Sequence, residues 1–129
     1  MLSAKHERVL TDARIGDAQG VRTAITDGLP VDVKGGRGQT PLMVAALFAN
    51  PEVVRLLIQS GADVNQRADN GSSVLIFAVL GHSTQIVEML LKKGVDTSVT
   101  DRHGLTALDW ARRHSYKDIE EMIVASIIG

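Results

Sequence analysis

The sequence predicts an all-α fold, an α-solenoid of four similar helix-turn-helix units with short β-hairpin connections.

 The prediction rests on two series of residues that recur at one period of 33 residues and differ in chemistry. The first series consists of glycines: Gly38, Gly71 and Gly104. The second consists of apolar residues: Leu42, Leu75, Leu108, Ala45, Ala78 and Ala111. Because both series keep the same period, each period predicts one unit that buries its apolar face against the next unit.

The start of each first helix is indicated by its capping residues. Thr40 offers a hydroxyl N-cap, and Pro41 follows at the first helical position, where its missing N–H costs nothing. Ser73 and Thr106 stand one and two periods after Thr40. The residues that follow Pro41 and Ser73 are apolar almost throughout, which predicts helices that are covered on most sides.

Apolar residues at helical spacing predict a second helix in each unit. We expect these helices near Pro51–Gln59, Thr84–Lys92 and Lys117–Ala125. Residues able to cap second helices recur at the same period: Asp17, Asn50 and Ser83. Glycines that favour a left-handed stop follow the second helices: Gly28, Gly61 and Gly94.

The second unit resembles the ankyrin repeat most closely. The matching segments are residues 38–46 (Gly-Gln-Thr-Pro-Leu-Met-Val-Ala-Ala), 53–57 (Val-Val-Arg-Leu-Leu) and 61–65 (Gly-Ala-Asp-Val-Asn). The resemblance implies one domain, residues 1–129, with units at about 2–34, 35–67, 68–100 and 101–129. It also implies a module that binds another protein and is not an enzyme. The glycine that the family carries between its helices is replaced by Ala49, His82 and Ser115, which leaves the geometry of those turns open.

The first and last units carry polar residues at positions that are apolar in the middle units, as expected for units that cap a stack. These residues are Thr11, Asp12, Arg14, Asp109, Arg112 and Arg113. Near the C-terminus, Ile127 is expected to cover the last core layer. Two alternatives are that the apolar tail forms a dimer contact and that the chain is an interaction segment of a larger protein.

Composition argues against several function classes. The chain has 129 residues, with 14 lysines and arginines against 15 aspartates and glutamates, so its formal charge is −1. Near-zero charge and an aromatic content of 3% argue against nucleic-acid binding. No cysteine is present, and no apolar run approaches the roughly 18 residues of a membrane span. We therefore expect a cytoplasmic protein with no membrane partner, although a mature exported form would look the same.

No catalytic, metal or cofactor site is expected. The strongest alternative is a metal-dependent or hydrolytic enzyme that uses His82, His103 and His114. However, Ser115 beside His114 lacks an orienting carboxylate and an oxyanion hole at that spacing. The glycine-rich segment 35–38 lacks the Gly-Lys-Ser/Thr ending of a phosphate loop, so we interpret it as a hairpin tip.

Asn65 is similar to the asparagine that is hydroxylated in ankyrin repeats of animal cells. Leu57 precedes it at the matching spacing, and Asp63 and Val64 stand directly before it. The alternative is a structural role, in which the Asn65 side chain hydrogen-bonds the loop backbone. The sequence alone does not decide between hydroxylation of Asn65 and this structural role.

The partner, a protein, is expected to bind in a groove at the C-terminal ends of the first helices. Its apolar floor is predicted to contain Ile15, Leu47, Phe48 and Leu80, flanked by Arg14, Arg113 and His114. The rim is predicted to come from the hairpin tips: Lys34, Arg37, Gln39, Arg67, Asp69, Asn70, Ser72, Arg102, His103 and Leu105. An apolar centre with a polar rim is typical of protein interfaces. The alternative is that Leu47 and Leu80 pack between units, which leaves Phe48 exposed alone.

Three further expectations complete the sequence-based prediction. Trp110 aligns with Val44 and Phe77, so we expect it in the core. The chain is expected to be a monomer. Its near-zero net charge predicts that association depends weakly on salt concentration.

Overall fold

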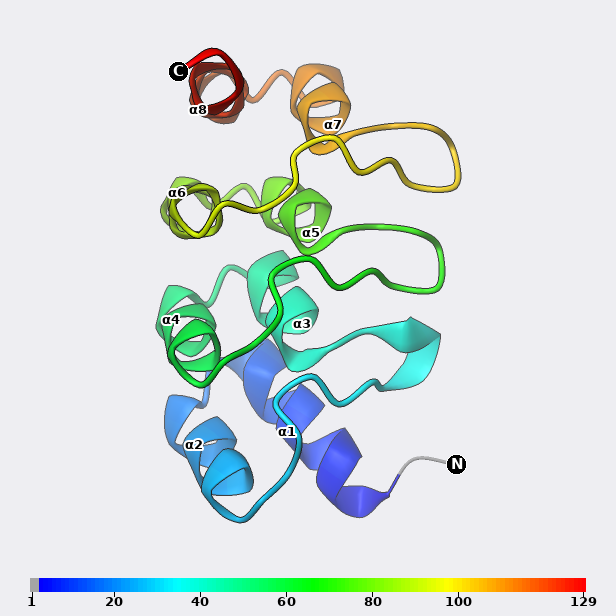
Figure 1. Cartoon of the computed structure of the whole chain (residues 1–129). Coiled ribbons are helices and arrows are strands. Elements are labelled where there is room, and N and C mark those ends of the chain that lie inside the picture. The colour runs from blue at the N-terminus through cyan, green and yellow to red at the C-terminus, as the bar shows by residue number, and fades with distance from the viewer. Residues whose placement is uncertain (1–2) are drawn as a thin grey trace.

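The computed structural model describes residues 3–129, which form eight α-helices and the short 3₁₀ helix η1 (Gly36–Gly38) in one stack (Figure 1). The α-helices alternate between an inner row, from which the long loops extend, and an outer row. The inner row contains α1 (Ala4–Ile15), α3 (Pro41–Leu47), α5 (Val74–Leu80) and α7 (Ala107–Arg113). The outer row contains α2 (Ala18–Thr26), α4 (Pro51–Gln59), α6 (Thr84–Lys92) and α8 (Lys117–Ile128). The expected bounds of α4 and α6 are confirmed, whereas α8 continues beyond Ala125 to Ile128.

Neighbouring helix pairs pack on each other, so the core is continuous along the stack. In the inner row α1 contacts α3, α3 contacts α5 and α5 contacts α7, and the outer helices make contact in the same order. Every residue of α3 except Leu47 is buried, and so is every residue of α5 except Leu80. A helix covered on most sides needs an almost uninterrupted apolar sequence, as these two helices have. The expected all-α solenoid is confirmed.

The inner helices begin where their hydroxyl caps predict. The Thr40 hydroxyl accepts a hydrogen bond of 3.3 Å from the Met43 N–H. Ser73 and Thr106 accept the equivalent bonds at 3.1 and 3.2 Å. Each hydroxyl satisfies a backbone donor that has no partner inside its own helix, and so fixes the first residue of that helix.

One of the three residues expected to cap outer helices has a different role. Asp17 and Ser83 cap α2 and α6 with hydrogen bonds of 2.9 and 3.2 Å. Asn50 makes no such bond to α4, so this prediction is wrong. Its Nδ2 instead donates to the carbonyls of Ala13 and Arg14, at 2.8 and 2.9 Å. Carbonyls at the end of a helix lack donors within the helix, and Asn50 therefore joins the second unit to the first.

The turns between paired helices share one conformation although three of the four lack glycine. Gly16 has a φ of 84°, and Ala49, His82 and Ser115 have φ values of 56°, 51° and 57°. All four residues are therefore left-handed, a conformation that costs a non-glycine residue roughly 1–2 kcal/mol. The geometry that the sequence left open is thus the same in every unit. The expected left-handed stops after the outer helices are also confirmed: Gly28, Gly61 and Gly94.

Hairpin-shaped loops connect the units and project from the inner row (Figure 1). Each has a backbone hydrogen bond of 2.8–3.0 Å across its base, and the donor and acceptor residues are Gly35 and Gln39, Ala68 and Ser72, and Asp101 and Leu105. Within residues 3–129 the single β-bridge is the antiparallel one between Arg67 and Ser73. The connections are therefore hairpins in shape, held by turns and by bonds between loops more than by paired strands.

The two ends of the stack differ from the expected caps at one position each. Thr11 and Arg14 are exposed as predicted, but Asp12 is only 8% exposed, so it does not turn a polar face to solvent. At the other end, Ile127 on α8 is 56% exposed, and the prediction that it covers the last core layer is wrong. In the described part of the chain, no helix is long and apolar enough to cross a bilayer.

Candidate functional site

The inner helices end in two consecutive positions that recur through the stack. The first position is held by Arg14, Leu47, Leu80 and Arg113, and the second by Ile15, Phe48, Gly81 and His114. Ile15 and Phe48 are exposed, at 62% and 51%. Leu47 and Leu80 are half-buried and pack against the core. The predicted apolar floor therefore presents two exposed side chains and two that are partly covered.

A shallow depression of about 210 Å³ lies beside Phe48. Arg14, Gln39 and Phe48 line it, so the fold brings three of the predicted residues together. The other lining residues are Leu10, Thr11, Gly36 and Val44. These four residues were not predicted from the sequence. One signal was present, because Thr11 and Val44 occupy the same repeat position in successive units. Three residues of the predicted floor do not line the depression: Ile15, Leu47 and Leu80.

The hairpin tips form a row because neighbouring loops are hydrogen-bonded to each other. The Asp69 N–H donates to the Arg37 carbonyl at 2.9 Å, and the Arg102 N–H donates to the Asn70 carbonyl at 3.1 Å. Of the ten tip residues expected at the rim, seven are exposed: Lys34, Arg37, Arg67, Asp69, Asn70, Arg102 and His103. Ser72 is only 5% exposed, so its expected place on the rim is wrong. Gln39 and Leu105 are half-buried. The bonds between loops hold the exposed tips at fixed spacing.

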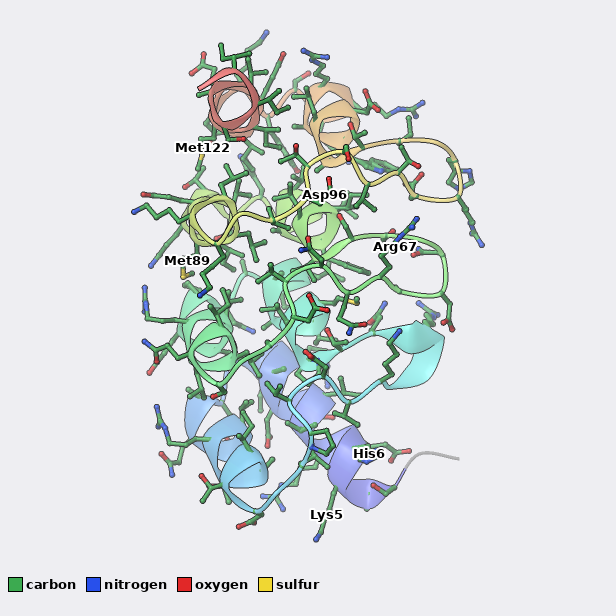
Figure 2. The ribbon with its side chains drawn as sticks, in the orientation of Figure 1. Lys5, His6, Arg67, Met89, Asp96 and Met122 are labelled. Atoms are coloured by element: carbon green, nitrogen blue, oxygen red, sulfur yellow. The ribbon has the colours of Figure 1, made fainter. Side chains whose placement is uncertain are left out.

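Two exposed cations of the predicted rim, Lys34 and Arg67, also brace the loops. The Lys34 Nζ donates to the Arg67 carbonyl at 3.4 Å, and the Arg67 Nη2 donates to the Thr100 carbonyl at 2.7 Å. These three residues occupy one repeat position, so the Lys34 and Arg67 side chains each reach the same position in the next unit. Arg67 is labelled in Figure 2. The Arg67 Nε also donates to the Gly71 carbonyl of its own hairpin, at 3.2 Å. Arg67 therefore joins two successive loops.

Asp101 fixes the third hairpin and was not predicted from the sequence. Its Oδ1 accepts hydrogen bonds from the N–H groups of His103 and Leu105, at 2.9 and 3.1 Å. Its Oδ2 accepts one of 2.8 Å from the Trp110 Nε1. Burial acts to raise the pKa of this carboxyl, but the hydrogen bonds together outweigh burial and hold its pKa below the usual value. Trp110 packs against the core as expected, yet stays half-buried with its polar edge on Asp101.

A comparison with protein-family models identifies the repeat. The model described as Ankyrin repeats (3 copies) matches residues 11–68 and 42–128, which together make up most of the chain. The chain belongs to the ankyrin repeat family. Ankyrin repeats are generally protein–protein interaction modules and are typically non-catalytic. A comparison with curated proteins gives no match.

Within the ankyrin stack, Gly81 allows a close approach between two inner helices. A Cβ at this position would lie 2.5 Å from the Ala46 carbonyl oxygen and 2.7 Å from the Leu47 carbonyl oxygen. Any larger residue would therefore push the C-terminal ends of α3 and α5 apart. Gly81 thus sets the position of Leu47, and of Phe48 after it, relative to α5. The repeat pattern did not point to this residue.

Two of the three histidines considered for catalysis, His82 and His114, make aromatic contacts with Tyr116, and the His82 contact joins two ankyrin units. The His82 ring stacks on the Tyr116 ring, with centroids 3.7 Å apart and an angle of 9° between planes. The His114 ring also stacks on the Tyr116 ring, with centroids 5.2 Å apart and an angle of 17° between the planes. His82 Nε2 is also 3.5 Å from a carboxylate oxygen of Asp118. Across residues 3–129, no group of three or more His, Asp or Glu side chains is placed to hold a metal ion.

Asn65 links the second ankyrin unit to the third. Its side-chain oxygen accepts a hydrogen bond of 2.9 Å from the Asp96 N–H, so the expected structural role is confirmed. Asp32 takes the same place one period earlier, where its carboxylate accepts from the Asp63 N–H at 3.2 Å. Hydroxylation of Asn65 stays a prediction, which mass spectrometry of the natural protein would test.

Proposed function

We propose that this ankyrin stack binds another protein through the ends of its inner helices and the tips of its hairpins. The observation that carries the proposal is the exposure of Phe48, at 51%, beside the depression lined by Arg14 and Gln39. Ile15 adds a second exposed apolar side chain at the same repeat position. Apolar side chains left exposed within a polar surround are typical of protein-binding surfaces.

We call the proposed binding residues the contact surface. They are Arg14, Ile15, Arg37, Gln39, Leu47, Phe48, Asp69, Asn70, Leu80, Arg102, His103, Leu105, Arg113 and His114. This set contains four arginines and one aspartate, so its charge is positive although the whole chain is close to neutral. We therefore expect the partner to present an acidic surface with an apolar centre that covers Phe48.

Rigid presentation is the proposed mechanism. The loops are joined by backbone bonds such as the one between Asp69 and Arg37, and Asn50 ties the end of α1 to the second unit. A surface that is already ordered loses little conformational entropy when it binds. Two versions fit this mechanism: the chain covers a partner's working surface as an inhibitor, or it holds partners together as a scaffold.

Serine substitutions at the exposed apolar residues test the proposal. The immobilised chain is used to capture proteins from a lysate of the native cells, and the retained protein is then purified for binding measurements. Phe48→Ser and Ile15→Ser should each weaken binding, by about 2 kcal/mol if the residue is a hot spot, which is about 30-fold in Kd. Both residues are exposed, so the variants should keep the helical spectrum of the parent.

Ile128→Ser is the matched control, because Ile128 is an apolar residue of α8 that is 81% exposed and lies outside the contact surface. Unchanged binding by this variant, with loss in Phe48→Ser, supports the contact surface. The reverse pattern would assign binding to the C-terminal tail and contradict the proposal. Sedimentation of the parent and of Ile128→Ser also tests the expected monomer against a dimer formed by the tail.

We further propose that residues 1–129 act as one domain in the cytoplasm. Packing of each helix pair on the next supports the single domain, and fractionation of native cells would test the location. The enzymatic alternative is tested by metal analysis of protein purified without a histidine tag. Stoichiometric zinc or iron would revive it.

A further inference from the structure

The first unit departs from the other three at two facing positions. Asp12 stands at the position that holds Ala45, Ala78 and Ala111 in the later units. Gly20 stands at the position that holds Val53, Ile86 and Ile119. All six of those apolar residues have no exposed surface. The first unit therefore has a carboxylate in place of a methyl group and an empty space in place of a branched side chain.

The two exchanges depend on each other. A Cβ added at Gly20 would collide with the Asp12 Oδ2. The glycine thus makes room for the carboxylate, and a valine or isoleucine as in the later units would not fit beside it. A polar cap would need only an exposed side chain, whereas this pair places a carboxylate on a residue that is only 8% exposed.

Asp12 has no partner among the described residues. Its residue surface is 92% covered, yet its carboxylate takes part in none of the side-chain hydrogen bonds or ion pairs of residues 3–129. Arg8 lies one helical turn earlier but makes no ion pair with it. Burial raises the pKa of Asp12, the Asp17 carboxylate raises it further, and Arg8 opposes both. The Asp12 oxygens still reach solvent, since no sealed side-chain oxygen or nitrogen of the described residues lacks a hydrogen-bond partner. A cation that enters from solvent can therefore pair with this carboxylate, which has no competing ion pair within the described residues.

The carboxylate lines a cavity of about 490 Å³. All lining residues lie between positions 5 and 29, so α1, α2 and the residues that flank α2 form the cavity within the first unit. Val9, Ala24 and Leu29 supply an apolar wall. Lys5 extends from the free end of the stack, away from α3, which places the cavity at that end (Figure 2). The volume falls within the range of pockets that bind small molecules, and a few polar groups on apolar walls are usual there.

We propose that this cavity binds an organic cation, a primary ammonium or guanidinium group at the end of an aliphatic chain. The cation pairs with the Asp12 carboxylate, and the aliphatic chain lies against Val9, Ala24 and Leu29. Asp17 adds negative charge at the cavity. Its Oδ1 accepts the capping bond from the Gly20 N–H, and its Oδ2 makes no hydrogen bond within the described residues. A metal ion is a poorer fit, because no group of three acidic or histidine ligands converges in the described residues. The site is separate from the contact surface.

Butylamine and spermidine serve as free probes, and a lysine peptide blocked at both ends serves as the probe for a protein-borne cation. Binding is followed by the backbone NMR signals of Gly20 and its neighbours. We expect saturable shifts with a Kd on the order of 1 mM or tighter. Tighter binding of the peptide assigns the cation to a partner chain, and tighter binding of spermidine assigns it to a small molecule. No saturable binding by any probe overturns the proposal.

Asp12→Asn keeps the shape of the side chain but removes its charge, and should weaken binding at least tenfold. The control is Glu88→Gln, which removes an exposed carboxylate on α6, and should leave binding unchanged. Equal losses in both variants would mean that the probes respond to net charge only, and would overturn the proposal. Arg8→Gln should strengthen binding several-fold, since Arg8 competes for the same carboxylate.

A double substitution separates loss of the binding site from loss of the fold. Asp12→Ala with Gly20→Val restores the pair of residue types found at positions 45 and 53, so this variant should fold at least as well as the parent. It also removes the carboxylate and fills the cavity, and it should bind no probe. Parental affinity in this folded variant would contradict the proposal.

Discussion

The indole Nε1 of Trp110 donates a hydrogen bond of 2.8 Å to the carboxylate of Asp101, and this bond ties α7 to the hairpin before it. The same carboxylate accepts hydrogen bonds from the N–H groups of His103 and Leu105. Both of these residues belong to the proposed contact surface. The arrangement of the third hairpin therefore depends on a side chain that the repeat pattern assigns to the core.

Trp110→Phe should destabilise the fold while keeping its aromatic packing. Loss of a hydrogen bond to a charged group costs about 1.5–3 kcal/mol, measured as the free energy of unfolding in urea. Amide hydrogen exchange at His103 and Leu105 should become faster as well. Tyr116→Phe is the control, since the Tyr116 hydroxyl makes no hydrogen bond within the described residues, and it should change stability by less than about 0.5 kcal/mol. Equal effects in both variants would contradict the role of the Trp110 bond.

Acid should weaken the fold through Asp101. The pKa of this carboxyl is lower in the folded chain than in the unfolded chain, so its charged form stabilises the fold above the ordinary pKa of aspartate. That stabilisation is lost as the pH falls through the folded value. Urea unfolding measured from about pH 7 down to about pH 3 should therefore show a shallower acid decline in Asp101→Asn than in the parent. Identical slopes would contradict the prediction.

Asp12 should have the opposite pH dependence. Its pKa is raised in the folded chain, so the stability that it contributes is present below the ordinary pKa of aspartate and is lost as the pH rises through the folded value. Asp12→Asn should therefore raise the free energy of unfolding at neutral pH, by roughly 1 kcal/mol. The gain should shrink when unfolding is measured near pH 4. A gain that is the same at both pH values would show that charge is not its cause.

Replacing the residue at a left-handed turn with glycine should stabilise the fold where the side chain of that residue makes no stabilising contact. Ala49→Gly relieves the steric cost of a positive φ but frees the unfolded chain, with an expected net gain of about 0.5–1 kcal/mol. His82→Gly should gain less or lose stability, because it also removes the stack on Tyr116. Thermal unfolding of the two variants side by side measures the difference. Equal gains would mean that the His82–Tyr116 stack contributes nothing.

Asn50→Ala should loosen the first unit. Two carbonyls at the end of α1 lose their donor, which costs about 1–3 kcal/mol when such groups stay covered. Asn50→Asp should cost more, because a carboxylate would then face the carbonyls of Ala13 and Arg14. Hydrogen exchange should increase in α1 and α2 more than in α7 and α8. A uniform increase through the stack would contradict a local role.

Salt should weaken partner binding more than the net charge predicts. The chain is nearly neutral, but Arg14, Arg37, Arg102 and Arg113 are all exposed on the contact surface. We therefore expect the association rate to fall several-fold between about 20 mM and about 500 mM salt. Arg37→Gln should flatten this dependence, whereas Arg55→Gln, on the outer helix α4, should not. A flat dependence in the parent would restore the expectation drawn from net charge alone.

Much of the fold could be predicted because its determinants are local and repeat. The caps at Thr40, Ser73 and Thr106 act on N–H groups three residues away, and apolar spacing sets the bounds of α4 and α6. The left-handed turns at Ala49, His82 and Ser115 follow from the repeated connection and not from the residue type. The extension of α8 to Ile128 and the exposure of Ile127 were not predicted, since no later repeat among the described residues packs on α8 and shows where this helix should end.

The candidate site was predicted only in outline. Repeat positions placed Phe48 and Ile15 on the surface correctly, but periodicity does not say how much neighbouring units cover a side chain, and Leu47 and Leu80 proved half-buried. The depression also uses Leu10 and Gly36, which come together with Phe48 only when two units are stacked.

By itself, the sequence determined the period, the helices and their order, because each depends on contacts within a few residues or on a pattern that recurs. The tertiary structure alone decided that Asn50 bonds to the end of α1, that Trp110 bonds to Asp101, and that Asp12 has no partner among the described residues. Polar side chains bond to whichever groups the packed units bring within about 3 Å, and those groups lie in other helices, loops or units. For Asp12 the packing supplies a cavity and no partner.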